Sequence, residues 1–574
     1  MNIEHTRHTL AHLLGAAVLE LYPDAKLTIG PAIDNGFYYD FEFSTPFSDT
    51  ELPKVEKKMR SLLPSWKEFS HREVSKDEAL ALYKDNVYKT ELVNGIESAI
   101  TLYTAGKFTD LCRGGHLDNP AKEIAEGSFK LTKSAGAYWR GDEKNKMLTR
   151  IYGLAFETKA ELEAYEKQIE DAKARDHKKL GKELGLFTFS DLVGAGLSLW
   201  TPKGTQLRES LIDYVWSLRK PYGYQKVTIP HITKKALYET SGHWAKYADD
   251  LFKIETREKH VYAMKPMNCP HHTQIFDSEP RTYKQMPQRY CETTMVYRDE
   301  QSGELSGLAR VLAITQDDAH VFCRENQIQT EVDHVWNIIQ TFYKTFGFEL
   351  AVRLSRRDPQ NPGKYMGEVE TWNRAEQTLK DFVEKKGVTW IDGVGEAAFY
   401  GPKLDFMAKD SLGREWQVAT IQLDFVQPTN FKLTCTNEKG EKEPVVMIHC
   451  AVTGSIERLL AILIEHYAGN FPLWLSPVQV AVIPVRENHN AAAKELSEKL
   501  LALDIRTQLM DDDENLGKKI RAVKNQKTPY TIIIGDKDIE AGKITLESRD
   551  HGQVGQLDAA EVIERIAREI KEKK

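Results

Sequence analysis

Three side chains that commonly bind zinc lie far apart in the chain, each inside a distinctive local sequence. Cys269 lies in KPMNCPHH, His320 in TQDDAH and His449 in VMIHCAVTGSIER. One thiolate and two imidazoles leave a tetrahedral Zn²⁺ with an open position for a substrate. No short metal-finger spacing joins them, so only a large fold can bring them together. Each residue alone is more typical of a buried thiol or an ordinary polar histidine, and only the set of three predicts a metal site.

The segment around the second ligand predicts one wall of a pocket. If TQDDAHVF is a strand, Gln316, Asp318 and His320 point to the same face, because side chains alternate along a strand. That face would carry an amide, a carboxylate and a metal ligand. His449 stands at the end of a second strand-like run, VVMIHC.

A group of arginines near these ligands suits phosphate. In MVYRDEQSGELSGLAR we expect Arg298 and Glu300 on one strand and Arg310 on the returning strand of a glycine-containing hairpin. In TGSIER, Arg458 stands near the start of a helix. The planar guanidinium donates hydrogen bonds in pairs, which matches phosphate oxygens. The alternative for each arginine is a surface ion pair.

A second cluster lies near the N-terminus. His8 and His12 are four residues apart on one predicted helix face, and Cys112 and His116 are four apart in DLCRGGH. From the spacing alone, the four side chains form either a closed zinc site or a set of ordinary core and surface residues.

Length and composition indicate a soluble protein of several domains. A chain of 574 residues is expected to hold roughly three or four domains. It contains no apolar run of transmembrane length and its first residues do not resemble a signal peptide, so we expect a cytoplasmic protein without membrane contact. The net charge of -7 excludes a surface that is basic throughout. A local basic stretch, residues 173–182, is either an RNA-facing patch or a solvated helix face.

The order of the predicted elements suggests where domains meet. Residues 7–22 predict an amphipathic helix, and residues 159–182 form a charged helical stretch typical of a linker. Two prolines in NFPLWLSP mark a later boundary. After it, strand-like and helical runs alternate as β-α-β-α-β, which predicts a compact α/β domain.

Seven motifs together carry a family resemblance. KPMNCP, TQDDAH, FYGPKLDF and CRGGH occur with YQKVTIP, YRDE…GLAR and GSIER. The chain resembles the class II aminoacyl-tRNA synthetases, and among them the bacterial threonyl-tRNA synthetases, from about residue 5 to its C-terminus. The last three motifs resemble class II motifs 1, 2 and 3. Motif 1 builds the dimer interface in that family.

The resemblance implies an α+β multidomain fold with a class II antiparallel sheet flanked by helices. The implied domains are an editing domain at 1–158, a linker helix at 159–185, a catalytic domain at 186–473 and an anticodon-binding domain at 474–574. The small ubiquitin-like domain that often precedes the editing domain in this family is not expected. The implied partners are tRNA(Thr), ATP, L-threonine and a second copy of the chain in a homodimer.

The resemblance also implies roles for single residues. One Zn²⁺ per subunit would be held by Cys269, His320 and His449. Threonine would be bound by Gln316, Asp318, Tyr400 and Gln422. ATP, with Mg²⁺, would be bound by Arg298, Glu300, Arg310, Lys403, Gln417 and Arg458. His243 would act in catalysis or positioning. Editing would use His8, His12, Lys89, Asp110, Cys112 and His116, which would orient a water against the ester. This is a third interpretation of the N-terminal cluster, and it is the one we prefer. It leaves open whether the cluster also binds a metal.

The activity implied is ATP-dependent attachment of L-threonine to tRNA(Thr) through threonyl-adenylate, with AMP and diphosphate as products. Hydrolysis of mischarged seryl-tRNA(Thr) would accompany it. One alternative is a catalytically inactive, synthetase-like RNA-binding regulator. Another is a metallohydrolase that uses either His/Cys cluster.

Five positions depart from the family pattern. Cys450 stands where the family usually has Arg, and Leu312-Ala313 where it usually has Arg-Gly. Glu547 replaces a positively charged residue of the anticodon domain, and Asp513 replaces an Asn. Because Glu547 would repel a phosphate, anticodon contacts are expected to be rearranged, with Arg549 as a candidate substitute.

Overall fold

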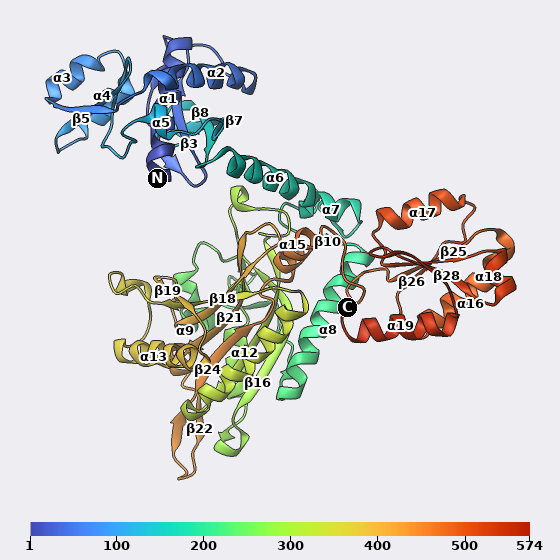
Figure 1. The fold of residues 1–574 in the computed structure, drawn as a ribbon. Helices are drawn as coiled ribbons and strands as arrows, with labels where there is room; N and C mark the ends of the chain where they lie inside the picture. Colours follow the sequence, from blue (N-terminus) through green and yellow to red (C-terminus); the bar gives the residue numbers. More distant parts are fainter. Residues whose placement is uncertain (1) are drawn as a thin grey trace. The chain divides into compact units, whose positions relative to one another are not determined.

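The computed structural model describes residues 2–574, and these residues form two compact units (Figure 1). The first ends at Asp171, and the second comprises Ala172–Lys574. The units are described separately below. Every helix among residues 2–574 is too short or too polar to cross a bilayer.

The first unit is built on a long helix that lies against an antiparallel sheet. The helix is α1 (Ile3–Leu21), and the amide oxygen of its N-cap, Asn2, accepts a hydrogen bond from the Glu4 N–H. The sheet has the strand order β1-β3-β8-β7, with β2 beside β3. Their bounds are β1 Lys26–Leu27, β2 Ala32–Ile33, β3 Gly36–Glu42, β7 Phe129–Tyr138 and β8 Met147–Ala155. A continuous apolar core joins the buried face of α1 to the aromatic side chains of β3.

A smaller sheet in the same unit carries Asp110, one of the predicted editing residues, on its last strand. Its strands, in the order β4-β5-β6, are Ser70–Val74, Ile100–Ala105 and Phe108–Leu111. Other helices of the unit are α2 (Leu52–Leu62), α3 (Lys76–Leu82), α4 (Val87–Asn94) and α5 (Pro120–Glu123). The loop after β6 turns through Gly114 and Gly115, whose φ angles are +105° and +87°. Such angles favour glycine, and they fold Cys112 and His116 back toward α1.

The charged stretch predicted as a single linker helix forms two helices. α6 spans Lys159–Arg175, and α7 spans His177–Glu183. Asp176 lies between them and caps α7 by accepting a hydrogen bond from the Lys178 N–H. A side chain that caps a new helix in this way ends the preceding one. The division between the two compact units falls within α6, and the domain boundaries at residues 158, 185 and 473 stay predictions.

The second unit contains the large, mainly antiparallel sheet that the resemblance implied. Its strand order is β11-β16-β17-β24-β21-β20-β18-β19, and only the pairs β11–β16 and β18–β19 are parallel. The bounds are β11 Gln225–Lys226, β16 Gln288–Tyr297, β17 Ala313–Cys323, β18 Leu350–Arg356, β19 Trp390–Val394, β20 Lys403–Lys409, β21 Glu415–Asp424 and β24 Val446–Ala451. TQDDAHVF and VVMIHC therefore are strands, as predicted.

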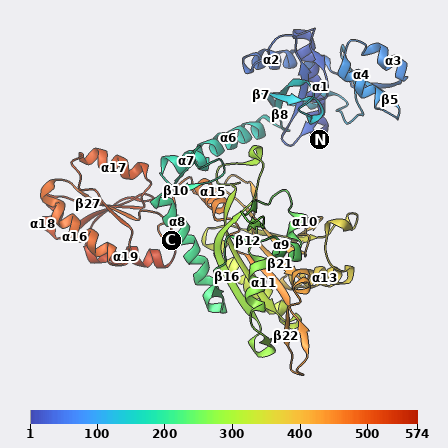
Figure 2. The ribbon, with the colours of Figure 1, turned by 180° about the vertical axis from the view of Figure 1, so that it is seen from behind.

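The two faces of this sheet have different environments. On one face, Ala319, Val321 and Cys323 of β17 are buried in the main apolar core together with α12 (Ile328–Thr345) and α15 (Ile456–His466). Figure 1 shows α12 along this face. On the other side, seen from behind in Figure 2, lie α9 (Lys235–Ser241), α10 (His243–Lys246) and α11 (Cys269–Asp277). The alternation of side chains along β17 thus assigns odd positions to the core and even positions to the opposite face.

Further elements surround this sheet. They are β9 Phe187–Thr188, β10 Leu199–Trp200, α8 Pro202–Arg219, β12 Ile232–Lys234, β13 Lys253–Glu255, β14 Val261–Met264, β15 Arg281–Thr282, α13 Val369–Lys386, α14 Val426–Asn430, β22 Thr434–Thr436 and β23 Lys442–Pro444. The motif YQKVTIP contains only the short strand β11, and the next strand, β12, begins after it at Ile232.

The hairpin predicted around the arginines also differs from expectation. β16 ends at Tyr297 and β17 begins at Ala313, so Arg298, Glu300 and Arg310 lie in the connecting loop and not on the strands. The loop closes on itself, because the Ser306 N–H donates to the Arg310 carbonyl at 3.1 Å. Arg310 therefore lies at the end of a turn outside the ladder of β16 and β17.

The last part of the chain forms the predicted α/β domain. Its sheet has the order β26-β25-β27-β28-β29, parallel from β26 to β27 and antiparallel beyond. The strands are β25 Val480–Pro484, β26 Thr507–Leu509, β27 Tyr530–Ile534, β28 Ile544–Ser548 and β29 Gly552–Leu557. The helices are α16 Asn490–Leu501, α17 Leu516–Asn525, α18 Asp536–Ala541 and α19 Ala559–Lys571.

A buried ion pair joins α8 to the central strands. The guanidinium of Arg219 forms a two-pronged contact with the carboxylate of Asp317, and both residues are almost fully buried. The same carboxylate accepts the N–H groups of Val452, at 2.9 Å, and Thr453, at 3.3 Å. Asp317 therefore fixes the chain that leaves β24 against β17.

We predict that Asp317→Asn lowers the free energy of unfolding by about 3–5 kcal/mol, because it leaves the Arg219 guanidinium buried without a counter-charge. Urea denaturation followed by tryptophan fluorescence measures this change. The matched control is Asp213→Asn. Asp213 is exposed and lies on α8, the helix that carries Arg219, so its substitution should change the free energy of unfolding by less than about 0.5 kcal/mol. An equal effect of the two substitutions would contradict the role of the ion pair.

Candidate functional site

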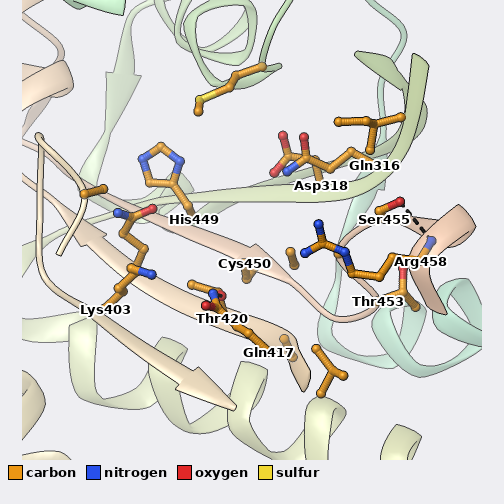
Figure 3. A pocket seen from close by; sticks show the side chains of 18 of the residues that line it. Gln316, Asp318, Lys403, Gln417, Thr420, His449, Cys450, Thr453, Ser455 and Arg458 are labelled. Carbon is orange, nitrogen blue, oxygen red and sulfur yellow. Dashed lines mark hydrogen bonds between the residues drawn. The ribbon is translucent and has the colours of Figure 1, made fainter. Parts of the chain in front are cut away.

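A cavity of about 380 Å³ lies on the sheet face opposite α12. Figure 3 shows the side chains of β17, β20, β21 and β24 arranged around it. Its lining includes acids, amides, imidazoles and guanidiniums, among them Asp318, Gln422, His449 and Arg458. One cavity therefore contains both the predicted metal ligands and part of the predicted phosphate-binding group.

The strand register explains why these residues meet. His320 of β17 lies directly opposite His449 of β24, which lies opposite Gln422 of β21, which lies opposite Lys403 of β20. Residues directly opposite one another in an antiparallel sheet point to the same face. The four side chains thus form one row across four strands. Gln316 and Asp318 extend this row along β17 at the alternate positions.

The three predicted metal ligands come together where α11 meets this row. One ligand atom from each of Cys269, His320 and His449 lies within 4.8 Å of the others. Cys269 is the first residue of α11 and is buried beneath the neighbouring elements. Cys269 and His449 are far apart in the sequence, and they meet because α11 packs against the sheet that contains β24.

The hydrogen bonds around the two imidazoles suit them to bind a metal. His449 Nε2 lies 2.8 Å from Asp424 Oδ2, so this carboxylate holds the ring proton and leaves the Nδ1 lone pair free. His449 Nδ1 lies 3.1 Å from His320 Nε2, and His320 Nδ1 lies 2.8 Å from His272 Nδ1. Burial lowers the pKa of His320 well below its usual value. A neutral ring whose outer nitrogen is occupied is the form that ligates a metal.

The thiol completes the donor set. Cys269 Sγ accepts a hydrogen bond from Gln427 Nε2 at 3.5 Å, and the same amide group contacts Asp424. Burial raises the pKa of the Cys269 thiol well above its usual value. A thiol in such surroundings stays protonated unless a cation replaces its proton. One thiolate and two imidazoles with an adjacent cavity therefore fit Zn²⁺ with an open position.

The predicted amino-acid ligands lie next to this donor set. Gln316, Asp318, Tyr400 and Gln422 all line the cavity. Asp318 Oδ2 accepts a hydrogen bond from Asn268 Nδ2 at 3.1 Å, and burial raises the pKa of Asp318 to about 6. The Tyr400 ring stacks on His449, with centroids 4.9 Å apart.

His243 lies behind the cavity rather than in it. Its ring is fully buried, its Nδ1 lies 2.9 Å from Ser241 Oγ, and its Nε2 lies 3.9 Å from Cys269 Sγ. Burial lowers the pKa of His243 to about 3. The imidazole is therefore neutral at physiological pH, which suits a positioning role better than proton donation.

The predicted nucleotide ligands divide into two groups. Arg298, Lys403, Gln417 and Arg458 line the cavity. Gln417 reaches this face because a bulge between β20 and β21 shifts the register at Phe406/Met407. Glu300 and Arg310 lie outside the lining and bind each other, with Arg310 Nε donating to Glu300 Oε2 at 2.8 Å. The loop that carries them borders the cavity through Arg458, whose Nε donates to the Ala309 carbonyl at 3.0 Å.

Several cavity residues were missed by the sequence analysis. Thr420 lines the cavity, and Asp424 binds His449. Both are two residues from Gln422, so the strand alternation of β21 could have found them. Ser455 also lines the cavity and caps α15, since its Oγ accepts the Arg458 N–H (Figure 3). The N-terminus of α15 thus faces the cavity with N–H groups that favour an anion.

The N-terminal cluster forms a second group in the first unit. One ligand atom from each of His8, His12, Cys112 and His116 lies within 4.8 Å of the others. Cys112 Sγ is 3.4 Å from His8 Nε2 and 3.5 Å from His116 Nε2. Burial lowers the pKa of His12 well below its usual value and that of His116 to about 2. All these rings are neutral at physiological pH.

A buried charged pair lies beside this cluster. Lys89 Nζ is 2.5 Å from Asp110 Oδ1, and both side chains are almost fully buried. Asp110 Oδ2 accepts a hydrogen bond from the Tyr39 hydroxyl at 2.6 Å and lies 3.4 Å from His12 Nδ1. The structure thus brings all six predicted editing residues into one region.

Comparison with known proteins places these two sites in one family. Residues 252–467 match the tRNA synthetase class II core domain (G, H, P, S and T), residues 479–569 an anticodon binding domain, and residues 100–152 the threonyl and alanyl tRNA synthetase second additional domain. The threonine–tRNA ligase of Rubrobacter xylanophilus is 48% identical over 95% of this chain and 85% of the relative. The chain belongs to the threonyl-tRNA synthetase family.

Further comparisons agree with this membership. The threonine–tRNA ligase of Cytophaga hutchinsonii is 46% identical over 98% of the chain and 88% of the relative. A crystal structure described as the RNA binding domain of threonyl-tRNA synthetase from Cryptosporidium parvum is 34% identical and covers 68% of this chain and 98% of its own, with a TM-score of 0.66. The threonyl-tRNA synthetase fold, with a class II core, an anticodon-binding domain and an editing-type domain, is therefore confirmed.

The positions that depart from the threonyl-tRNA synthetase pattern have defined surroundings. Cys450 is buried, and its Sγ lies 3.6 Å from the Tyr224 hydroxyl. The Leu312 N–H donates to the Gly196 carbonyl at 2.9 Å.

The departures in the anticodon-binding domain involve charged residues. Glu547 lies 3.5 Å from Lys524 Nζ. Arg549, the suggested substitute in anticodon contacts, donates to the carbonyls of Phe471 and Lys527 and to Asp550, so its guanidinium is already engaged. Nothing in the structure explains Asp513.

We predict that Asp110→Asn destabilises the first unit by about 3–5 kcal/mol, because the Lys89 ammonium would stay buried without its counter-charge. Adding Lys89→Met to this variant should recover most of the loss, since both charges are then absent. Hydrogen–deuterium exchange of peptides that cover α4 and β6 in the full chain measures the local stability. Failure of the second substitution to restore protection would contradict this electrostatic explanation.

Proposed function

We propose that the chain attaches L-threonine to tRNA(Thr) with ATP, through threonyl-adenylate, and hydrolyses mischarged seryl-tRNA(Thr) in its N-terminal domain. AMP and diphosphate are the other products. The observation that carries the proposal is the row of His320, His449, Gln422 and Lys403, which joins a metal-ligand set to a nucleotide cavity. Family membership supports the same activity.

Adenylate formation requires the threonine carboxylate to approach the α-phosphorus of ATP while diphosphate departs. Arg298 and Arg458 line the cavity and would bind the phosphates of ATP. Mg²⁺ would neutralise part of the negative charge of these phosphates. Lys403 Nζ lies 2.7 Å from Asp405 Oδ2, and Gln417 Nε2 lies 2.8 Å from Asp405 Oδ1. This carboxylate would hold both side chains in place beside the nucleotide.

Selection of threonine depends on the metal-ligand set and on Asp318. A Zn²⁺ held by Cys269, His320 and His449 would act as a Lewis acid that attracts the amino group and the side-chain hydroxyl of threonine. Asp318 would bind the ammonium or the hydroxyl, and Gln316, Tyr400 and Gln422 would surround the rest. An apolar pocket alone rejects an isostere that differs by one hydroxyl only about 10²-fold. Valine would leave polar groups of this site without partners.

Serine is not rejected by the same means, because it has the hydroxyl and lacks only a methyl group. A missing methyl group is worth about 1–3 kcal/mol in binding. The N-terminal site would therefore remove serine after transfer, with His8, His12, Cys112 and His116 around the ester and Lys89 and Asp110 beside them. We assign this site to water-dependent ester hydrolysis.

The remaining partners follow from the family. The C-terminal domain would bind the anticodon region of tRNA(Thr), and the protein would act in the cytoplasm as a homodimer. The comparisons favour the enzyme over an inactive RNA-binding regulator. A metallohydrolase using the Cys269 set is disfavoured, because that set opens into a cavity lined by phosphate-binding arginines.

The most direct test is ATP–pyrophosphate exchange with threonine, serine and valine side by side. We expect exchange with threonine, weaker exchange with serine and the weakest with valine, because only the first two carry the hydroxyl. Absence of threonine-dependent exchange would disprove the proposed function.

We predict that Cys269→Ala loses bound zinc and more than about 100-fold of threonine-dependent exchange, since two imidazoles alone hold the metal weakly. Metal analysis by mass spectrometry and the exchange assay measure the two losses. Cys323→Ala is the matched control, because Cys323 is an equally buried thiol on the core face of β17. It should keep its zinc. Normal exchange in Cys269→Ala would contradict the zinc proposal.

We predict that the double variant His8→Ala/His12→Ala charges tRNA with threonine normally but accumulates seryl-tRNA(Thr), because the hydrolytic site is lost while the catalytic unit is unchanged. Acid-gel analysis of tRNA charged in the presence of serine measures the product. His71→Ala, an exposed histidine of the same unit, is the control and should not accumulate it. Equal seryl-tRNA levels in all three proteins would refute the editing assignment.

A further inference from the structure

His177 connects three segments that meet beside the nucleotide cavity. It is the first residue of α7 and is 5% exposed. Its Nδ1 lies 2.6 Å from Glu465 Oε1 at the end of α15. On the other side of the ring, Nε2 accepts a hydrogen bond from the Leu308 N–H at 3.0 Å. The imidazole thus joins α7 and α15 to the loop between β16 and β17.

The hydrogen bonds define the protonation state of this ring. Burial alone would raise the pKa of Glu465, but hydrogen bonds from His177 and Arg414 outweigh it and lower the pKa to about 2. Glu465 is therefore an ionised acceptor, so His177 Nδ1 must carry the proton. Nε2 then has the free lone pair that the Leu308 N–H requires. Asp176 caps α7, and both ring nitrogens are engaged, so the trio Asp176, His177 and Glu465 is a hydrogen-bond network rather than a metal site.

The loop is shaped to accept this ring. Gly307 has φ +51°, and a Cβ on it would lie 2.3 Å from His177 Nε2. The next residue, Leu308, is fully buried in the main core. Ala309 follows and receives the hydrogen bond from Arg458 at its carbonyl. Arg310, one of the predicted ATP ligands, comes directly after it.

We propose that His177 is a positioning residue for ATP: it holds the backbone at Leu308 so that the loop presents Arg310 and engages Arg458 in the arrangement that binds phosphate. The inference rests on the proposed function, since it assumes that these arginines bind ATP. The loop residues 301–304 are exposed. The hydrogen bond from the Leu308 N–H to His177 connects the later part of this loop to α7, which is not part of the sheet. Loss of that bond would free the loop without removing any group that contacts the nucleotide.

Two substitutions separate the two bonds of the ring. In His177→Asn, the amide nitrogen occupies the place of Nδ1 and still donates to Glu465, but no acceptor faces the Leu308 N–H. In His177→Gln, the amide oxygen reaches the place of Nε2 and can accept from Leu308, whereas the side-chain donor to Glu465 is lost and only the backbone N–H of residue 177, 3.1 Å from Glu465 Oε1, still donates to it. The exposed neighbour Lys179 gives the matched control, Lys179→Asn, on the same helix.

The expected result is a reversal of order between two measurements. In threonine-dependent ATP–pyrophosphate exchange, His177→Asn should raise the KM for ATP roughly 5- to 30-fold, as for a buried N–H without a partner. His177→Gln should raise it less, and the KM for threonine should stay unchanged in both. In thermal unfolding, His177→Gln should have the lower Tm, because it loses the side-chain bond to ionised Glu465. Gly307→Ala should raise the KM for ATP as well.

Three outcomes overturn the inference. An unchanged KM for ATP in His177→Asn would show that the loop does not need the bond. A higher KM for ATP in His177→Gln than in His177→Asn would mean that the KM follows the loss of stability, and would show a merely structural role. Parallel increases in the KM values for ATP and threonine would show general damage to the cavity. Failure of the proposed function is distinguishable, because the unmodified chain and Lys179→Asn would then show no threonine-dependent exchange at all.

Discussion

The register of the central antiparallel sheet is the constraint on which both halves of the catalytic cavity depend. Pairing of β17 with β24 places His320 opposite His449, and the same ladder carries Gln422 and Lys403 into line. A slip of one residue would turn each side chain to the core face. The buried alternate positions of β17, such as Val321, resist that slip because they would have to leave the main apolar core. Core packing therefore maintains the metal-ligand geometry.

Much of the site could be predicted because its residues follow strand periodicity. The alternation of Gln316, Asp318 and His320 needs only the local sequence, and the structure shows these three on one face. What could not be predicted is the pairing between distant strands and the bulge that brings Gln417 to the cavity. Asp424 could have been placed on the cavity face of β21 by the alternation from Gln422, but its bond to His449 depends on the pairing of β21 with β24.

The loop between β16 and β17 shows where pattern alone fails. A glycine-containing stretch between two strands suggested a simple hairpin with arginines on its arms. Instead the chain leaves the ladder at Tyr297 and returns at Ala313, and the turn at Ser306–Arg310 is held from outside by His177 and Arg458. Neither contact leaves a signal near the loop in the sequence, since His177 precedes it by more than a hundred residues.

The two His/Cys groups in this chain illustrate how similar donors acquire different surroundings. Around Cys269, the ring proton of His449 is held by the buried carboxylate of Asp424, so a lone pair faces the other ligands. In the N-terminal group, the buried carboxylate of Asp110 is instead neutralised by Lys89 and lies at the edge of the cluster. His8, Cys112 and His116 are only partly buried there. The first arrangement favours a firmly held cation, whereas the second sets partly exposed neutral rings beside a buried ammonium–carboxylate pair, which suits orientation of a water molecule.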